Sequence, residues 1–179
     1  SDNIVRISHL GNDGNIYPKP GINTSRMIYY IPTMDVEYTI NNKSGNTIIT
    51  TNDIEISIEL ETNKVSFYDL NDGIILKESN IIYTKTTEPV LNDETYDITL
   101  EWEFNDINTL IYGWGSYQNG VLNYRDETVR CVQFNTEICQ PSFITNNGYG
   151  IYWDNNGATV LNSINNNIDN TKLKMDRSW

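Results

Sequence analysis

The densest group of residues with binding chemistry is the segment 111–125, which reads IYGWGSYQNGVLNYR. It joins aromatic rings to glycines and adds amides and an arginine. Trp and Tyr faces stack on the C–H faces of sugars, while amide and guanidinium groups bond to hydroxyls. The segment therefore predicts a carbohydrate contact, with Trp114 and Gln118 as candidate binding residues. The competing interpretation is structural, because aromatic residues in a β-sandwich usually fill the core or close its ends.

The sequence does not contain a recognisable catalytic set. Glycosidase chemistry needs two carboxyl groups about 5 to 9.5 Å apart, and spacing along strands does not reveal such a pair. Glu55, Glu59, Glu101 and Glu103 alternate with apolar residues, which is typical of the solvated face of a strand. A Ser or Cys nucleophile would need an imidazole base, and His9, the only histidine, is expected on the surface near a terminus. We expect no catalytic residue in this chain.

Metal and cofactor sites are not predicted either. Two cysteines, Cys131 and Cys139, and one histidine are too few for a structural zinc site. The motif Gly113-Trp114-Gly115 lacks the later glycine and the helix of a phosphate-binding loop. The two cysteines flank a turn expected around Asn135, where a hairpin would bring them within disulfide distance. We expect free thiols, with a bridge as the alternative if the protein is exported.

Length and charge limit the class of protein. A chain of 179 residues fits one domain, and 38% hydrophobic residues are enough for a core. Twelve basic against 24 acidic residues give a net charge of −12, which repels nucleic acid and anionic membranes. Apolar runs fall short of the roughly 18 residues of a membrane helix. The start at Ser1 suggests that a native targeting segment is missing, so localisation stays open.

The elements that must position these residues are strands. Residues 54–61 and 98–104 alternate apolar and polar side chains with a period of two. Residues 64–70, the turn Asn71-Asp72-Gly73 and residues 74–76 predict a hairpin. Asn162 to Asn170 is expected to be a long turn or loop, followed by a last strand over 171–179. Weaker strand candidates are 27–31, 35–40, 47–51, 81–87, 129–134, 149–153 and 158–161. This pattern predicts an all-β antiparallel sandwich.

Several ordered blocks resemble the N-terminal β-sandwich domain of glycoside hydrolase family 31, which includes α-glucosidases and α-xylosidases. Residues 65–69 (VSFYD) with 73–78 (GIILKE) look like the family's hairpin. Tyr112-Gly113-Trp114-Gly115 is similar to its Tyr-Gly-Leu-Gly signature, with Trp in place of Leu and Gln118 as the nearest candidate for the displaced polar residue. Residues 118–125 are most similar to the α-xylosidase branch, and the resemblance continues through 133–135, 141–143, 148–151 and 153–155.

The resemblance implies a galactose-mutarotase-like supersandwich that precedes a (β/α)8 barrel. In this family both catalytic Asp residues belong to the barrel, so residues 1–179 are expected to form a single non-catalytic N-terminal domain, cut before its final strands or before the barrel. The implied partners are that barrel and an α-linked oligosaccharide. The loop that relatives extend toward the barrel's pocket corresponds here to Phe134, Asn135, Thr136 and Glu137, our further candidate substrate-binding residues. For this loop the alternative is an ordinary hairpin turn.

Two other functions compete with an accessory domain. A free-standing carbohydrate-binding module or lectin-like sandwich is favoured by the aromatic content and disfavoured by the barrel-adjacent motifs. An aldose epimerase on the same fold would need histidines for its acid and base, which His9 alone does not supply.

Overall fold

The computed structural model describes residues 4–5, 7, 36–71, 73–87, 94–133, 135–155, 157–162 and 172–178. These residues form twelve strands and no helix, so the described part of the chain contains no helix that could cross a membrane. Two compact units divide the chain, residues 1–74 and 75–179.

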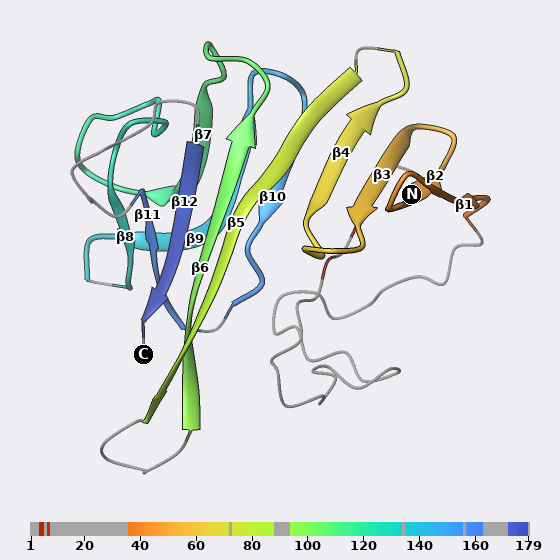
Figure 1. Ribbon diagram of the computed structural model, residues 1–179. Coiled ribbons are helices and arrows are strands. Elements are labelled where there is room, and N and C mark those ends of the chain that lie inside the picture. Colours follow the sequence, from red (N-terminus) through yellow and green to blue (C-terminus); the bar gives the residue numbers. More distant parts are fainter. Residues whose placement is uncertain are drawn as a thin grey trace. The chain divides into compact units, whose positions relative to one another are not determined.

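The described strands of the first unit form an antiparallel meander, β1 (Thr39–Lys43), β2 (Asn46–Thr50), β3 (Ile54–Glu59) and β4 (Val65–Asp69), paired in chain order (Figure 1). Ser44 and Gly45 between β1 and β2 both have positive φ, 53° and 82°, as a tight hairpin turn requires. Ile56 and Val65 are 7% and 5% exposed and supply the core of this unit.

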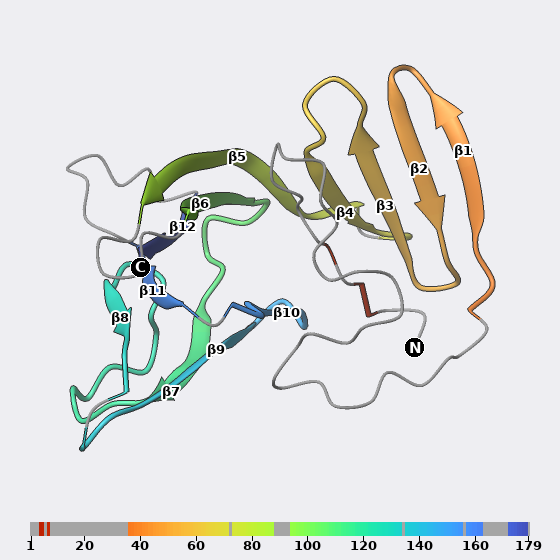
Figure 2. The same cartoon turned by 90° about the horizontal axis from the view of Figure 1, so that it is seen from below.

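The second unit contains two antiparallel sheets. The larger has the order β5 (Gly73–Thr87), β6 (Glu94–Phe104), β12 (Lys172–Ser178), β11 (Ala158–Leu161) and β8 (Val129–Cys131). The smaller has the order β10 (Gly150–Tyr152), β9 (Ile138–Thr145) and β7 (Ile111–Ser116). Figure 2 shows them as separate layers.

Large side chains from both sheets of the second unit form its core. Trp102 and Phe104 of β6 are 4% and 5% exposed, and Ile111 of β7 is fully buried. The rings of Trp114 on β7 and Phe143 on β9 lie 5.8 Å apart. The predicted all-β antiparallel fold is confirmed.

Most of the predicted strands exist, with corrected ends. The alternating segments 54–61 and 98–104 contain β3 and most of β6, and the two strands of the predicted hairpin coincide with β4 and the start of β5. Of the weaker candidates, 47–51, 81–87, 149–153 and 158–161 coincide with strands, whereas 129–134 ends already at Cys131. The candidate 35–40 is largely wrong, because β1 begins at Thr39. Residues 27–31 lie outside the described residues. The strand expected over 171–179 is β12, and it lies in the interior of the larger sheet, between β6 and β11.

Candidate functional site

The signature Tyr112-Gly113-Trp114-Gly115 forms an irregular part of β7. Gly113, Trp114 and Gly115 all have positive φ, at 116°, 69° and 122°. Gly113 pairs with Phe143 but Gly115 pairs with Cys139, so β9 carries two more residues than β7 across this bulge. A positive φ is costly for a tryptophan and persists only where packing imposes it.

The bulge directs Trp114 into the core. Its side chain is 1% exposed and packs beside Phe143. The ring therefore has no open face on which a sugar could stack. Its burial agrees with the structural interpretation, in which the aromatic residue fills the core. The contribution of Trp114 is therefore to fix the path of β7 toward residues 116–118.

One end of the three-stranded sheet brings together two segments that the sequence analysis selected separately. Ser116 at the end of β7 pairs with Ile138 at the start of β9, so Tyr117 and Gln118 leave the sheet where Thr136 and Glu137 enter it. The pKa of Tyr117 is consistent with this proximity of the two segments. Burial, and after it the negative charge of Glu137, raise that pKa to about 12. We call residues 117–118 and 135–137 the sheet-end cluster.

The candidate residues of this cluster differ in exposure. Gln118, Asn135 and Thr136 are exposed and Glu137 is partly exposed, so their polar atoms are accessible in this chain. Phe134 lies outside the described residues. Tyr117, which the sequence analysis did not select as a site residue, is partly buried with its ring centroid 6.1 Å from that of Tyr124.

A disulfide closes the loop that contains Asn135, Thr136 and Glu137. Cys131 on β8 is bonded to Cys139 on β9, with the two Cα atoms 5.1 Å apart. The expectation of free thiols is therefore wrong. Its physical reason is that β8 and β9 approach each other at the distance where disulfides form, and the bridge joins strands of two different sheets.

Polar groups of the segment 119–127 mostly serve the fold. Arg125 is 7% exposed, and its guanidinium donates to the carbonyl of Thr109 at 2.5 Å and lies 5.2 Å from the centroid of the Phe104 ring. The side-chain amide of Asn162, at the end of β11, donates to three carbonyls of the segment 124–127, at 3.4, 2.6 and 3.1 Å. The predicted role of this arginine in binding hydroxyls does not fit its burial. Asn162 had no sequence signal beyond its position in an Asn-rich stretch.

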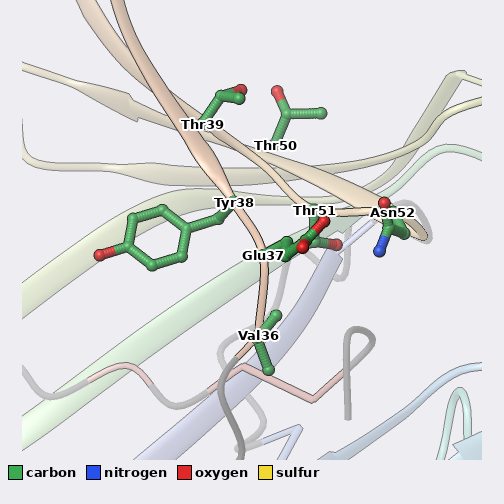
Figure 3. Close-up of a pocket in the computed structure, with 7 residues that line it drawn as sticks. All are labelled: Val36, Glu37, Tyr38, Thr39, Thr50, Thr51 and Asn52. Atoms are coloured by element: carbon green, nitrogen blue, oxygen red, sulfur yellow. The ribbon is translucent and has the colours of Figure 1, made fainter.

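A depression of about 570 Å³ lies on the first unit, beside the start of β1 and the end of β2. Its polar lining residues are Glu37, Tyr38, Thr39, Thr50, Thr51 and Asn52. Figure 3 shows the Tyr38 ring projecting away from the Asn52 side; this tyrosine is 61% exposed. Thr51 uses its hydroxyl locally, accepting from the amides of Asp53 and Ile54 at 3.2 and 3.1 Å.

Comparisons with known proteins point to one enzyme family. No family model matches the sequence. An α-xylosidase of Saccharolobus solfataricus is 26% identical in an alignment over 169 residues that covers 87% of this chain and 21% of that protein. α-Xylosidase A of Aspergillus niger is 29% identical in an alignment over 101 residues that covers 51% of this chain and 13% of that protein.

Solved structures share the fold. The GH31 α-xylosidase of Xanthomonas citri has a TM-score of 0.65 at 24% identity, over 70% of this chain and 14% of its own. A GH31 α-xylosidase from a soil metagenome, complexed with xylose, has a TM-score of 0.61 at 18% identity, over 79% of this chain and 23% of its own. A GH31 dextranase of Flavobacterium johnsoniae has a TM-score of 0.59 at 15% identity, over 78% of this chain and 17% of its own.

The matched region is a small part of each similar protein. The chain spans about one fifth of the Saccharolobus relative and about one eighth of the Aspergillus relative. The resemblance to glycoside hydrolase family 31 is confirmed, since the sequence relatives are α-xylosidases and the GH31 structures named above share this fold over a small part of their own chains.

Proposed function

We propose that this chain is the non-catalytic N-terminal domain of a retaining α-glycoside hydrolase of the α-xylosidase or α-glucosidase type. In the complete enzyme it packs on the catalytic (β/α)8 barrel and contributes the loop 134–137 to the wall of the sugar pocket. The observation that supports the proposal is the sheet-end cluster, in which Gln118 and the exposed Asn135 and Thr136 lie beyond the last paired residues of β7 and β9, at one end of the small sheet.

The chemistry of the loop suits sugar binding. The Asn135 amide both donates and accepts, as does the Thr136 hydroxyl, and a sugar hydroxyl needs both functions. Glu137 adds an acceptor, and its partial exposure leaves it accessible to solvent. Binding groups of this kind orient the substrate and select between sugars, while the nucleophile and the general acid come from elsewhere.

The absence of catalysis is tested on the chain alone. Concentrated protein is assayed with nitrophenyl α-xyloside and nitrophenyl α-glucoside, and we expect no turnover above the buffer rate. Turnover that disappears when an acidic residue of this chain is mutated would show that the domain carries catalytic groups, against the proposal.

The role of the loop is tested in the full-length enzyme. Asn135→Ala is expected to lower kcat/KM about tenfold or more, because about 1.4 kcal/mol of transition-state binding corresponds to a factor of ten. Asn105→Ala is the matched control, since Asn105 is also exposed but follows β6, outside the cluster. Wild-type kinetics of Asn135→Ala with several aglycones would restrict the loop to a structural role.

A second candidate, a free-standing carbohydrate-binding module, is favoured by the depression beside Tyr38. An exposed tyrosine next to hydroxyl, amide and carboxylate side chains matches the chemistry of a sugar-binding surface. Titration of the isolated chain with xylose- and glucose-containing oligosaccharides separates the two functions. Millimolar or tighter binding that is lost in Tyr38→Ala and retained in Asn135→Ala would favour the module.

A further inference from the structure

We propose that the Cys131–Cys139 disulfide is the positioning element of the substrate loop, so that the oxidised bridge holds Asn135, Thr136 and Glu137 in their binding geometry. This inference rests on the proposed function of the loop. The bridge closes the loop over a sequence separation of eight residues, and all the described candidate residues of the loop lie inside it.

Both ends of the bridge are attached to well-packed strands. Cys131 pairs with Thr159 of β11, which is 1% exposed, and the neighbouring Val129 of β8 is 5% exposed. Cys139 pairs with Gly115 of β7, and a Cβ on that glycine would lie 3.0 Å from the Cα of Cys139. The two anchors therefore belong to different sheets, and the disulfide fixes the distance between them across the loop.

The described residues of the loop have little burial to hold them. Val132, Gln133, Asn135, Thr136 and Glu137 are all exposed or partly exposed, and none of them is buried. Ordering the backbone costs about 1–2 kcal/mol per residue, so loop residues whose side chains are not buried sample many conformations unless the ends of the loop are constrained. A covalent constraint removes part of that cost before the sugar arrives, which is how preorganisation increases affinity.

Glu137 marks the end of the loop that strand pairing with β7 already fixes. Glu137 lies two residues before Cys139, and its negative charge contributes to the raised pKa of Tyr117 on the neighbouring segment. The start of β9 is thus aligned with the end of β7 at the same place where the bridge is attached. Loss of the bridge frees the β8 side of the loop from this arrangement.

The test uses the full-length enzyme and the double variant Cys131→Ala/Cys139→Ala. We expect a KM for nitrophenyl α-xyloside about fivefold to tenfold higher, with kcat changed by less than about twofold, because the loop binds the sugar and does not take part in bond breaking. Circular dichroism and a Tm above the assay temperature verify that the variant is folded. A phosphine reductant should raise the KM of the wild type in the same way and leave the double variant unchanged. Titration of the free thiols measures how much of the Cys131–Cys139 bridge has been reduced.

Asn135→Ala in both backgrounds separates positioning from general stability. If the bridge positions Asn135, this substitution costs about tenfold in kcat/KM with the bridge and less than about twofold without it. An equal cost in both backgrounds, or an unchanged KM on removing the bridge, would overturn the inference while leaving the proposed function intact. No cost of Asn135→Ala in the bridged enzyme would instead contradict the proposed function. If the double variant does not fold, the same comparison is made on wild type and Asn135→Ala enzymes reduced in the folded state.

Discussion

Gly115 on β7 lies directly against the backbone of Ile138 on β9. A Cβ built on Gly115 would overlap the carbonyl oxygen of Ile138 and come within 3.0 Å of the backbone of Cys139 and Gln140. The φ of Gly115 is also positive, at 122°. Both the space and the backbone conformation therefore require glycine at the point where the sheet-end cluster begins.

Gly115→Ala is expected to lower the free energy of unfolding by about 3 kcal/mol or more, because backbone strain and a backbone clash add. Gly120→Ala is the control, since Gly120 also has positive φ, 70°, but open space around it. That substitution should cost about 1 kcal/mol from the backbone conformation alone. Urea unfolding followed by circular dichroism measures both, and equal losses would show that the clash is relieved at no cost.

Asn162→Ala is expected to lower the free energy of unfolding by about 2–4 kcal/mol. The substitution leaves the carbonyls of Tyr124, Arg125 and Glu127 without the amide that donates to them. Asn162 also has a positive φ of 49°, so Asn162→Gly separates the two effects by removing the amide and keeping the backbone permitted. Asn162→Gly should regain only about 1 kcal/mol of the free energy of unfolding that Asn162→Ala loses. Full recovery of the wild-type Tm would mean that the amide contributes nothing.

Glu137→Gln is expected to lower the pKa of Tyr117 from about 12 without bringing it to the ordinary value of 10.0. Burial is the larger cause of the raised pKa and remains, while the negative charge of Glu137 is removed. Titration of the phenol signals by NMR or ultraviolet absorbance measures the change. Glu127→Gln is the control, because Glu127 is not among the causes of the shift. An unchanged pKa of Tyr117 in Glu137→Gln would show that the Glu137 carboxylate is not close enough to Tyr117 to affect its titration.

Because the phenol of Tyr149 has a raised pKa, we expect the folded state to lose stability at high pH. Burial raises its pKa to about 12, against the opposing positive charge of Arg125. Between pH 10 and 12 the unfolded chain releases the phenol proton while the folded chain keeps it, so this contribution is complete below pH 10 and is lost as the pH rises to 12. In Tyr149→Phe the free energy of unfolding should fall less over this interval than in the wild type. Chemical denaturation at several pH values provides the comparison, and identical slopes would contradict the assignment.

The thiol count tests the disulfide itself. Denatured, unreduced protein is expected to show no reactive thiol, and the same protein after reduction should show two. Closing a loop of this length stabilises the folded state by about 2.5 kcal/mol through the entropy of the unfolded chain, so reduction should lower the Tm. Cys131→Ala/Cys139→Ala should have the Tm of the reduced protein. Two thiols before reduction would refute the bridge.

Regular alternation made most of the fold predictable. In 54–61 and 98–104 every second residue is apolar, and the strands that form there bury Ile56, Leu100 and Trp102. β7 and β9, which were not predicted, lack this regularity. Gly113 and Gly115 interrupt β7, and Pro141 interrupts β9 in the stretch of extra residues opposite Trp114, where a ladder amide is not required.

The candidate site was predictable only in part. Residues 135–137 and 117–118 are distant in sequence, and their meeting depends on the register of β7 with β9, which those same interruptions conceal. The burial of Trp114 depends on which face the bulged β7 presents, and that of Arg125 on the Thr109 carbonyl and the Phe104 ring that its guanidinium contacts. Composition alone determines neither. The disulfide depended on the approach of two sheets, which no local pattern encodes.

The position of β12 between β6 and β11 has a consequence for biosynthesis. Residues 172–178 supply the hydrogen-bonding partners of both neighbours, so β11 and β8 have no path of strand pairing back to β6 until they are present. Until residues 172–178 have been synthesised, β6 has one edge without its final partner strand, and such an edge is a template for pairing with another chain. Completion of the larger sheet is therefore a long-range step that follows synthesis of this strand.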